Sequence, residues 1–564
     1  MASATSARSA TNALKTVAVL GASYGGARAA QILANGLPQG WRVVLVDRNS
    51  HMNHLYVLPR YAVLPGHEHK AFIPYRTVFD LPPAHDAPPD APKPHVDLSR
   101  HTMLHASVVS LGAHELTLDR AFPEHGISDC VLRFEYLVYA LGSHLPSPIN
   151  LWGPVADEVE KDGVVDIVRG TKEGGVAWLK KFQARVERAS SVLVVGGGAL
   201  GIQYATDIAE IYPATQVTLL HSRHRLLPRF DEDMHTEILS TLSSLNVCTI
   251  LGDRLDLSSL QDKSTGAERV ARTQSGREIR AELVLLCTGQ TPNTTLLGQT
   301  FPDVVVQDGP NKGMARVRRT LQLAAPLAGY HEEPTLPVEV FTAPEPASEA
   351  PTTPAVEREL AEPSSSQVVD AEEHEELEEE EEEPEPIEED PHTRVAAEHI
   401  FAIGDAADAF GAVNAGHNAF FQGEVAARNI LKLVKRAQHE SESRERLLQQ
   451  LPFAPYAPHA PSAPTEAAAE EDLELQKYVP GAPAIKVSLG LVSSPSSLPG
   501  DASADSRTQT KSVYQFQGMI GIRDKEPADL DVHLIWRYFG HNVTREDLEV
   551  DQDFGATEAK AVTA

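Results

Sequence analysis

Two glycine-rich turns, each between a strand-like run and a helix-like run, limit the folds open to this chain more than any other feature. The first follows the apolar run VAVL and places Gly21, Ser23 and Gly26 at the small-residue positions of a GxGxxG pattern. The first glycine permits a tight turn, and the small second residue lets a pyrophosphate approach the helix N-terminus. The next strand-like run ends at Asp47, so residues from Lys15 to Asp47 form one strand–helix–strand unit. An ordinary glycine turn is the alternative, and the complete unit disfavours it.

The same order of segments returns at Ser191. Here Gly196, Gly198 and Gly201 fill the three positions without substitution, and the next strand-like run ends at His221. Two such units in a single chain predict an α/β protein with two Rossmann-like nucleotide-binding domains.

The residue that ends the second strand of each unit indicates which ribose the unit binds. Asp47 lies 21 residues past Gly26, where a carboxylate accepts hydrogen bonds from both ribose hydroxyls. At the corresponding place His221 is followed by Ser222 and Arg223, which offer donors and positive charge to a 2′-phosphate. The pattern favours NADPH over NADH, unless the arginine is only an exposed surface charge.

Charge and cysteine content exclude several other classes of protein. Residues 332–390 hold 23 acidic residues and one basic residue, out of a net charge of −30, so the rest of the chain carries about −8. No concentrated basic face occurs, which argues against nucleic acid as a main partner. The three cysteines form no CxxC pair, which excludes a disulfide scaffold, a zinc ribbon and a dithiol redox pair. His54, His417 and His541 are isolated, so no metal site is predicted. No apolar run is long enough for a transmembrane helix.

Six motifs in a fixed order carry a resemblance to a known family. They are GASYGG, VVSLGAHELTL, YLVYALGS, VVGGGALG, LVLLCTGQTPN and IFAIGDAADAF. The set resembles the FAD-dependent reductases with two dinucleotide-binding domains, and within them the apoptosis-inducing-factor-like group that includes ferroptosis suppressor protein. The resemblance covers about residues 15 to 325 and 394 to 437 and, more weakly, 477 to 541. It implies a glutathione-reductase-like fold with a small α+β C-terminal domain, FAD as cofactor, NADPH or NADH as co-substrate, and a quinone-type acceptor.

The resemblance also implies roles for individual residues. It assigns FAD contacts to Gly21, Ser23, Gly25, Gly26, Asp47, Arg60, Val108, Gly404 and Asp405. It assigns NAD(P)H contacts to Gly196, Gly198, Gly201, His221, Arg223 and Gly289. The helix expected from about residue 414 to 437 would direct its N-terminus at the flavin.

No catalytic side chain is certain, and two glutamines are candidate neighbours of the flavin and nicotinamide. Gln203 stands where the family usually has a glutamate near the nicotinamide, so this chain keeps the shape and loses the charge. Gln422 is the other candidate, and a polar residue on a half-exposed helix face is the equal alternative for it.

Composition and resemblance together predict the division of the chain. The FAD-binding domain comprises 15–150, 291–324 and 394–437, the NAD(P)H-binding domain 151–290, and the C-terminal domain 476–545. The segments 1–14, 325–393, 438–475 and 546–564 are predicted to be disordered tails, insertion and linker, because they are too polar to form a core. The acidic insertion is interpreted as a solvated spacer, with an interaction tail of unknown partner as the alternative.

Aromatic residues near the C-terminus allow two interpretations. Ile535, Trp536, Tyr538 and Phe539 form either a lipid-facing surface through which a quinone enters or the packing of the third domain on its own sheet. We expect a cytoplasmic protein, peripheral to membranes or lipid droplets in the first case; a mitochondrial location is the weaker alternative. A flavin-binding signalling protein with little turnover is the main rival function, and a flavin monooxygenase is disfavoured by the order of the motifs.

Overall fold

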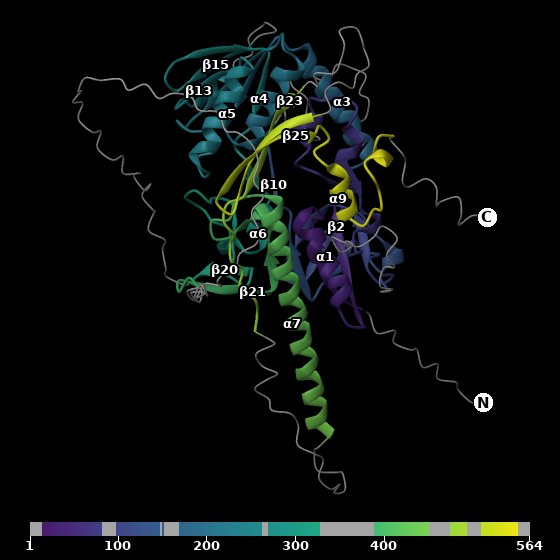
Figure 1. Ribbon diagram of the computed structural model, residues 1–564. Helices are drawn as coiled ribbons and strands as arrows, with labels where there is room; N and C mark the ends of the chain where they lie inside the picture. Colours follow the sequence, from purple (N-terminus) through teal and green to yellow (C-terminus); the bar gives the residue numbers. More distant parts are fainter. Residues whose placement is uncertain are drawn as a thin grey trace, which may run out of the picture. The chain divides into compact units, whose positions relative to one another are not determined.

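The structure is a computed structural model of the chain, and it describes residues 14–81, 97–146, 149–151, 169–261, 269–327, 389–449, 474–492 and 509–550. The predicted tails, acidic insertion and linker lie largely outside these residues. Within them, two α/β domains are accompanied by a small C-terminal sheet (Figure 1).

The first domain is built on a six-stranded sheet. From edge to edge its strands are β20 (Gln322–Pro326), β21 (Thr393–Ala402), β9 (Tyr136–Tyr139), β1 (Lys15–Leu20), β2 (Trp41–Asp47) and β5 (Thr102–His105). Neighbours are parallel except β20 and β21, which are antiparallel and pair Pro326 with Thr393. Every residue of β1 after Lys15 is buried, as expected of a parallel strand that is covered on both faces.

The second domain has a four-stranded sheet in which all neighbours are parallel. Its strands in order are β13 (Cys248–Leu251), β12 (Gln216–His221), β11 (Ser191–Val195) and β17 (Leu283–Leu286). The helices are α3 (Lys172–Arg188), α4 (Ala199–Ile211) and α5 (Glu232–Ser244). The predicted α/β class with two Rossmann-like domains is confirmed.

Shorter elements complete the two domains. Two antiparallel sheets consist of β6 (Val108–Leu111), β7 (Glu115–Leu118) and β8 (Val131–Arg133), and of β14 (Leu255–Asp256), β15 (Arg269–Thr273) and β16 (Glu278–Ala281). The remaining strands and helices are β3 (His51–Asn53), α2 (Leu58–Tyr61), β4 (Phe72–Pro74), β10 (Ser143–His144), β18 (Thr291–Pro292), α6 (Thr295–Thr300), β19 (Ala315–Arg316) and β22 (Ala407–Asp408).

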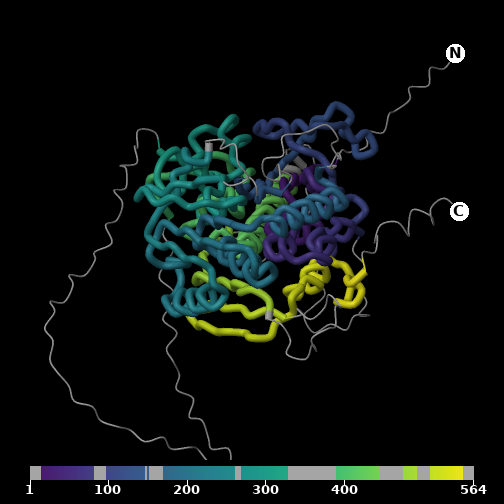
Figure 2. The backbone as a smooth tube through the Cα atoms, turned by 90° about the horizontal axis from the view of Figure 1, so that it is seen from above, coloured from purple at the N-terminus to yellow at the C-terminus, as the bar shows by residue number. Residues whose placement is uncertain are grey.

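The C-terminal part combines an antiparallel sheet with one short helix. The sheet consists of β23 (Ile485–Val492), β24 (Gln509–Phe516) and β25 (Met519–Pro527), and the helix is α9 (Val532–Tyr538). β23 packs against α4, and β24 packs against α5. Figure 2 shows this segment in yellow along one side of the two nucleotide-type domains.

Aromatic residues at the end of α9 and directly after it lie at the first domain. Trp536 and Phe539 are fully buried, and Nε1 of Trp536 donates to the carbonyl oxygen of Lys70 across 2.9 Å. The ring of Tyr538 lies 5.4 Å from that of Phe420. The two most buried aromatics are therefore not available to a lipid surface, and the contacts of Trp536 and Tyr538 join the C-terminal part to the first domain.

Helix α7 (Gly416–Gln449) runs beside α1 (Tyr24–Gly36) and continues twelve residues past the predicted end (Figure 1). The two helices cross at glycines. A Cβ on Gly25 would lie 2.5 Å from the carbonyl oxygen of Ala419, and a Cβ on Gly423 would lie 2.3 Å from that of Gly25. Because no real Cβ makes such contacts, the crossing requires both glycines.

Candidate active site

The first glycine-rich turn lies between β1 and α1 and leaves the helix N-terminus open. Gly21 has a φ of +87°, and a Cβ on Gly26 would lie 1.8 Å from the Gly21 carbonyl oxygen. Ser23 is the N-cap of α1, yet its side chain makes no capping hydrogen bond, and the first turn contains no acidic residue. A helix N-terminus of this kind favours a bound anion, so the turn fits the pyrophosphate of a dinucleotide. Gly25, which is also predicted to contact FAD, permits the close approach of α7.

Asp47 ends β2 beside this turn. Its Oδ2 accepts from the backbone N–H of Ala22 and its Oδ1 from that of Asn49, each across 2.8 Å. Burial raises the pKa of the Asp47 carboxyl, and these two donors act against the rise. Val108 begins β6, two residues after Ala106, whose N–H donates to the Asp47 carbonyl oxygen across 2.9 Å. The structure thus brings the predicted ribose and adenine neighbours together.

The second turn repeats this geometry. Gly196 has a φ of +125°, and a Cβ on Gly201 would lie 1.9 Å from the Gly196 carbonyl oxygen. The N–H of Gly197 donates to Nδ1 of His221 across 3.1 Å, in the position where Ala22 donates to Asp47 in the first unit. Gly198 is the N-cap of α4, and a Cβ placed on it meets no atom within 4 Å.

His221 is held as a neutral ring at the end of β12. Burial lowers its pKa, and the positive charge of Arg223 lowers it further. With Nδ1 accepting from Gly197, the proton of the neutral ring is on Nε2, which is buried without a partner among the described atoms. Arg223 itself is exposed. The pair thus offers an N–H donor and a positive charge at one place.

Asp405 follows β21 and is contacted by Gln290, which lies between β17 of the second domain's sheet and β18. Its Oδ2 accepts from Oγ of Ser143 across 3.0 Å and from Nε2 of Gln290 across 2.7 Å. Burial raises the pKa of the Asp405 carboxyl, which both donors oppose. Gln290 follows Gly289, whose φ is +77°. Sequence reasoning missed Gln290, although it lies in the CTGQTPN motif that marked Gly289.

Gln422 supports the same loop from inside α7. It is 2% exposed, and its Oε1 accepts from the N–H of Gly404 across 2.7 Å. The alternative of a half-exposed polar residue is therefore wrong. A small cavity borders this loop, lined by Gly404, Asp405, Ala407, Ala409, Ala412, Val413, Asn414, Ala415, Asn418, Ala419 and Gln422.

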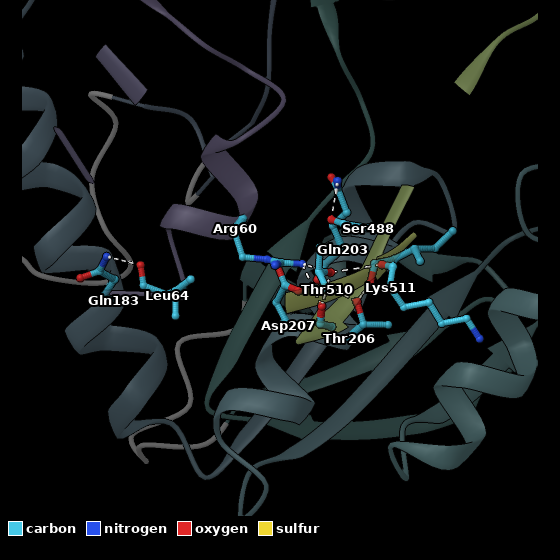
Figure 3. A network of polar contacts seen from close by, with 11 residues as sticks. Arg60, Leu64, Gln183, Gln203, Thr206, Asp207, Ser488, Thr510 and Lys511 are labelled. Carbon is cyan, nitrogen blue, oxygen red and sulfur yellow. Dashed lines mark hydrogen bonds and ion pairs between the residues drawn. The ribbon is translucent and has the colours of Figure 1, made fainter. Parts of the chain in front are cut away.

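Arg60 and Gln203 lie in a buried network with the C-terminal sheet (Figure 3). Nε of Arg60 donates to Asp207 on α4, and its Nη2 donates to Thr510 and to the carbonyl oxygen of Gly490. Nε2 of Gln203 donates to Oγ of Ser488 on β23 across 3.1 Å. A buried guanidinium requires a carboxylate, and Asp207 supplies it. These bonds leave only the unpartnered Nη1 of Arg60 for the predicted contact with FAD.

Two kinds of feature are absent from the described residues. They contain no group of three or more His, Cys, Asp or Glu side chains arranged to hold a metal ion. Among the same residues, every helix is too short or too polar to cross a membrane.

The chain is similar in sequence to one family model and to several known proteins. Residues 15–308 match the model of the family described as pyridine nucleotide-disulphide oxidoreductase. Fe-regulated protein 8 of Mycosarcoma maydis is 37% identical over 488 residues, which cover 85% of this chain and 88% of that protein. Ferroptosis suppressor protein 1 of Taeniopygia guttata is 26% identical, with 54% of this chain and 70% of that protein covered. Apoptosis-inducing factor homolog B of Dictyostelium discoideum is 24% identical with the same coverage.

Proposed function

Because the chain belongs to the pyridine nucleotide-disulphide oxidoreductase family, it is a pyridine nucleotide-dependent flavin oxidoreductase, and we propose that its electron acceptor is a quinone-type molecule. FAD and NAD(P)H are the cofactors of the family. The three cysteines lie at 130, 248 and 287, too far apart in sequence for the adjacent pair of a disulfide reductase.

The hydrogen bond from Gln290 to Asp405 is the observation that best supports this function. It joins the segment that follows β17 of the second domain's sheet to the loop predicted to bind the ribityl chain of FAD. A nicotinamide on the second turn and a flavin on the first would then share one region. When bound, the flavin supplies hydride acceptance from NAD(P)H and electron delivery to an acceptor.

The chain's own residues would then bind the two cofactors and orient them. The two open helix N-termini would hold the pyrophosphates, and Asp47 would accept from a ribose hydroxyl. The start of α7 would place its partial positive charge near the flavin, where reduction builds negative charge. The quinone-type acceptor itself is what the resemblance of the six motifs implies.

We further propose that NADPH is preferred to NADH. The Nε2–H of His221 and the exposed guanidinium of Arg223 match the acceptors and charge of a 2′-phosphate, whereas a carboxylate at this place would repel it. Their placement at the end of β12 supports the assignment.

Purified protein tests the function directly. It should be yellow, should bleach anaerobically with NADPH faster than with NADH, and should regain its colour with a short-chain quinone. Gly198→Ala should keep its FAD and its fold, because the space there is open, yet bleach at least about tenfold more slowly, since the methyl group blocks the pyrophosphate. Gly481→Ala, also in open space, is the matched control. Colourless protein, or normal bleaching of Gly198→Ala, contradicts the proposal.

One observation favours a second function, a flavin-binding signalling protein with little turnover. Gln203 replaces the family's glutamate, and its amide is engaged by Ser488. Turnover below about one per minute with every quinone tested, far under the usual range of enzymes, would support this function against the first.

A further inference from the structure

Arg229 of the second domain contacts a loop of the first domain. It lies in the exposed part of the segment between β12 and α5, and its Nη2 donates to the carbonyl oxygen of Gly411 across 2.7 Å. Gly411 belongs to the 409–413 loop, which is part of the connection from β22 to α7. Three residues of this loop line the small cavity that Asp405 also borders. The Arg229 guanidinium therefore reaches the loop beside the predicted flavin site.

The segment that carries Arg229 is bonded to the second glycine-rich turn. The carbonyl oxygen of Gly197 accepts from the N–H of Leu227 across 3.1 Å, and the N–H of the same glycine donates to Nδ1 of His221. Leu226 and Leu227 are buried, so the segment has little freedom to move relative to the turn. One short segment therefore joins the predicted NAD(P)H site to the 409–413 loop.

The backbone of the 409–413 loop is strained. Phe410 has a φ of +58°, which is unfavourable for a residue with a side chain, and Gly411 has a φ of +75°. Such a conformation persists only where the surrounding contacts determine it, and it is typical of functional sites. Two arginines supply contacts here. The guanidinium of Arg319 lies 3.9 Å from the centre of the Phe410 ring, and Arg229 donates to the carbonyl oxygen of the next residue.

We infer that Arg229 is a positioning residue, which holds the 409–413 loop and the start of α7 in a fixed position relative to the nucleotide on the second turn. The inference rests on the proposed function and deepens it. The loop passes its position on to α7, because Nδ2 of Asn418 donates to the carbonyl oxygen of Val413 across 2.8 Å. Hydride transfer depends steeply on the placement of its two partners, and a displacement of about 1 Å can slow a reaction about a hundredfold.

The first test measures anaerobic bleaching of the full chain with bound FAD at increasing NADPH concentrations. Arg229→Met should lower the rate at saturating NADPH about tenfold, as expected for the loss of one hydrogen bond from a charged donor, and should leave the NADPH concentration for half-maximal rate unchanged. Arg229→Lys keeps a charged donor and should recover part of the rate. Lys511→Met is the matched control, because it removes a different contact of the second domain, the ion pair with Glu237, and should bleach like the wild type.

The second test measures the contact itself in the cofactor-free protein. With carbonyl-¹³C glycine and ¹⁵N alanine, the Gly411 carbonyl resonance is detected through Ala412 and is assigned by its loss in Gly411→Asn, since asparagine tolerates a positive φ. It should shift in Arg229→Met and stay unchanged in Lys511→Met.

Three results would overturn the inference: a Gly411 resonance that Arg229→Met leaves unchanged, normal bleaching of that variant, or a change confined to the NADPH concentration for half-maximal rate. A wild-type protein that does not bleach overturns the proposed function instead, while the Gly411 resonance still tests the contact of Arg229 with the loop.

Discussion

The guanidinium of Arg60 donates to the carboxylate of Asp207 across 2.7 Å, with the two side chains 1% and 0% exposed. Arg60 belongs to α2 of the first domain and Asp207 to α4 of the second, and Thr510 of the C-terminal sheet accepts from the same guanidinium. One buried guanidinium therefore links all three parts of the protein.

Asp207→Leu should destabilise the protein by about 3–5 kcal/mol, because it leaves the Arg60 charge buried without its carboxylate. The double variant Arg60→Met with Asp207→Leu should recover most of this loss, since it removes both charges. Urea unfolding measures the difference. Arg272→Met is the control, because the Arg272–Glu278 pair is 58% and 50% exposed and should contribute less than about 1 kcal/mol. Equal losses in the single and double variants would refute this account.

Gly25→Ala should destabilise the crossing of α1 and α7 by about 1–3 kcal/mol, because its methyl group meets the backbone oxygen of Ala419. Gly36→Ala on the same helix should be neutral or stabilising. Its methyl group meets only the flexible side chain of Leu431, and alanine favours a helix by about 1 kcal/mol over glycine. Thermal unfolding of both variants checks the contrast, and similar melting temperatures would argue against a glycine-dependent crossing.

Arg223→Glu should lower the preference for NADPH over NADH by about ten- to a hundredfold, because a charge-assisted hydrogen bond contributes about 1.5–3 kcal/mol. The ratio of kcat/KM for the two nucleotides is the measurement. Arg280→Glu makes the same charge change at an exposed residue of β16 and should leave the ratio unchanged. An unaltered ratio in Arg223→Glu would mean that its guanidinium is only a surface charge.

Acid should destabilise the cofactor-free protein between about pH 6.5 and pH 4. Burial lowers the pKa of His51 to about 4 and that of His54 to about 3, whereas both protonate near 6.5 in the unfolded chain. The unfolded state thus binds more protons in this window. The free energy of unfolding therefore decreases as the pH is lowered, by up to about 1.4 kcal/mol per pH unit for each histidine. His51→Gln should reduce the slope of unfolding free energy against pH by one such increment. A slope equal to that of the wild type would exclude His51 as a source.

The local architecture of both nucleotide-type units could be predicted from sequence because its causes are local. The run from Lys15 to Asp47 is short enough that glycine spacing and apolar runs determine the strand, turn, helix and strand. The same holds from Ser191 to His221. The position of Asp405 shortly after the buried end of β21 follows from the motif in the same way.

Contacts between distant segments could not be predicted. Arg60 contacts Asp207 at a sequence separation of 147 residues, and Gln203 contacts Ser488 at a separation of 285 residues. Contacts at such separations produce no local pattern in the sequence. The length of α7 was also underestimated, because its last turns are polar and look like a linker in sequence. The burial of Gln422 depends on Gly404, which approaches it only in the folded protein.

The antiparallel pairing of Pro326 with Thr393 brings the two ends of the long acidic stretch side by side. The sheet therefore tolerates insertions of different lengths between these two residues. The entropic cost of closing such a loop grows only with the logarithm of its length. This junction is a natural place for relatives to differ in size, and a practical one at which to graft an epitope tag or a fluorescent reporter without disturbing the nucleotide-binding core.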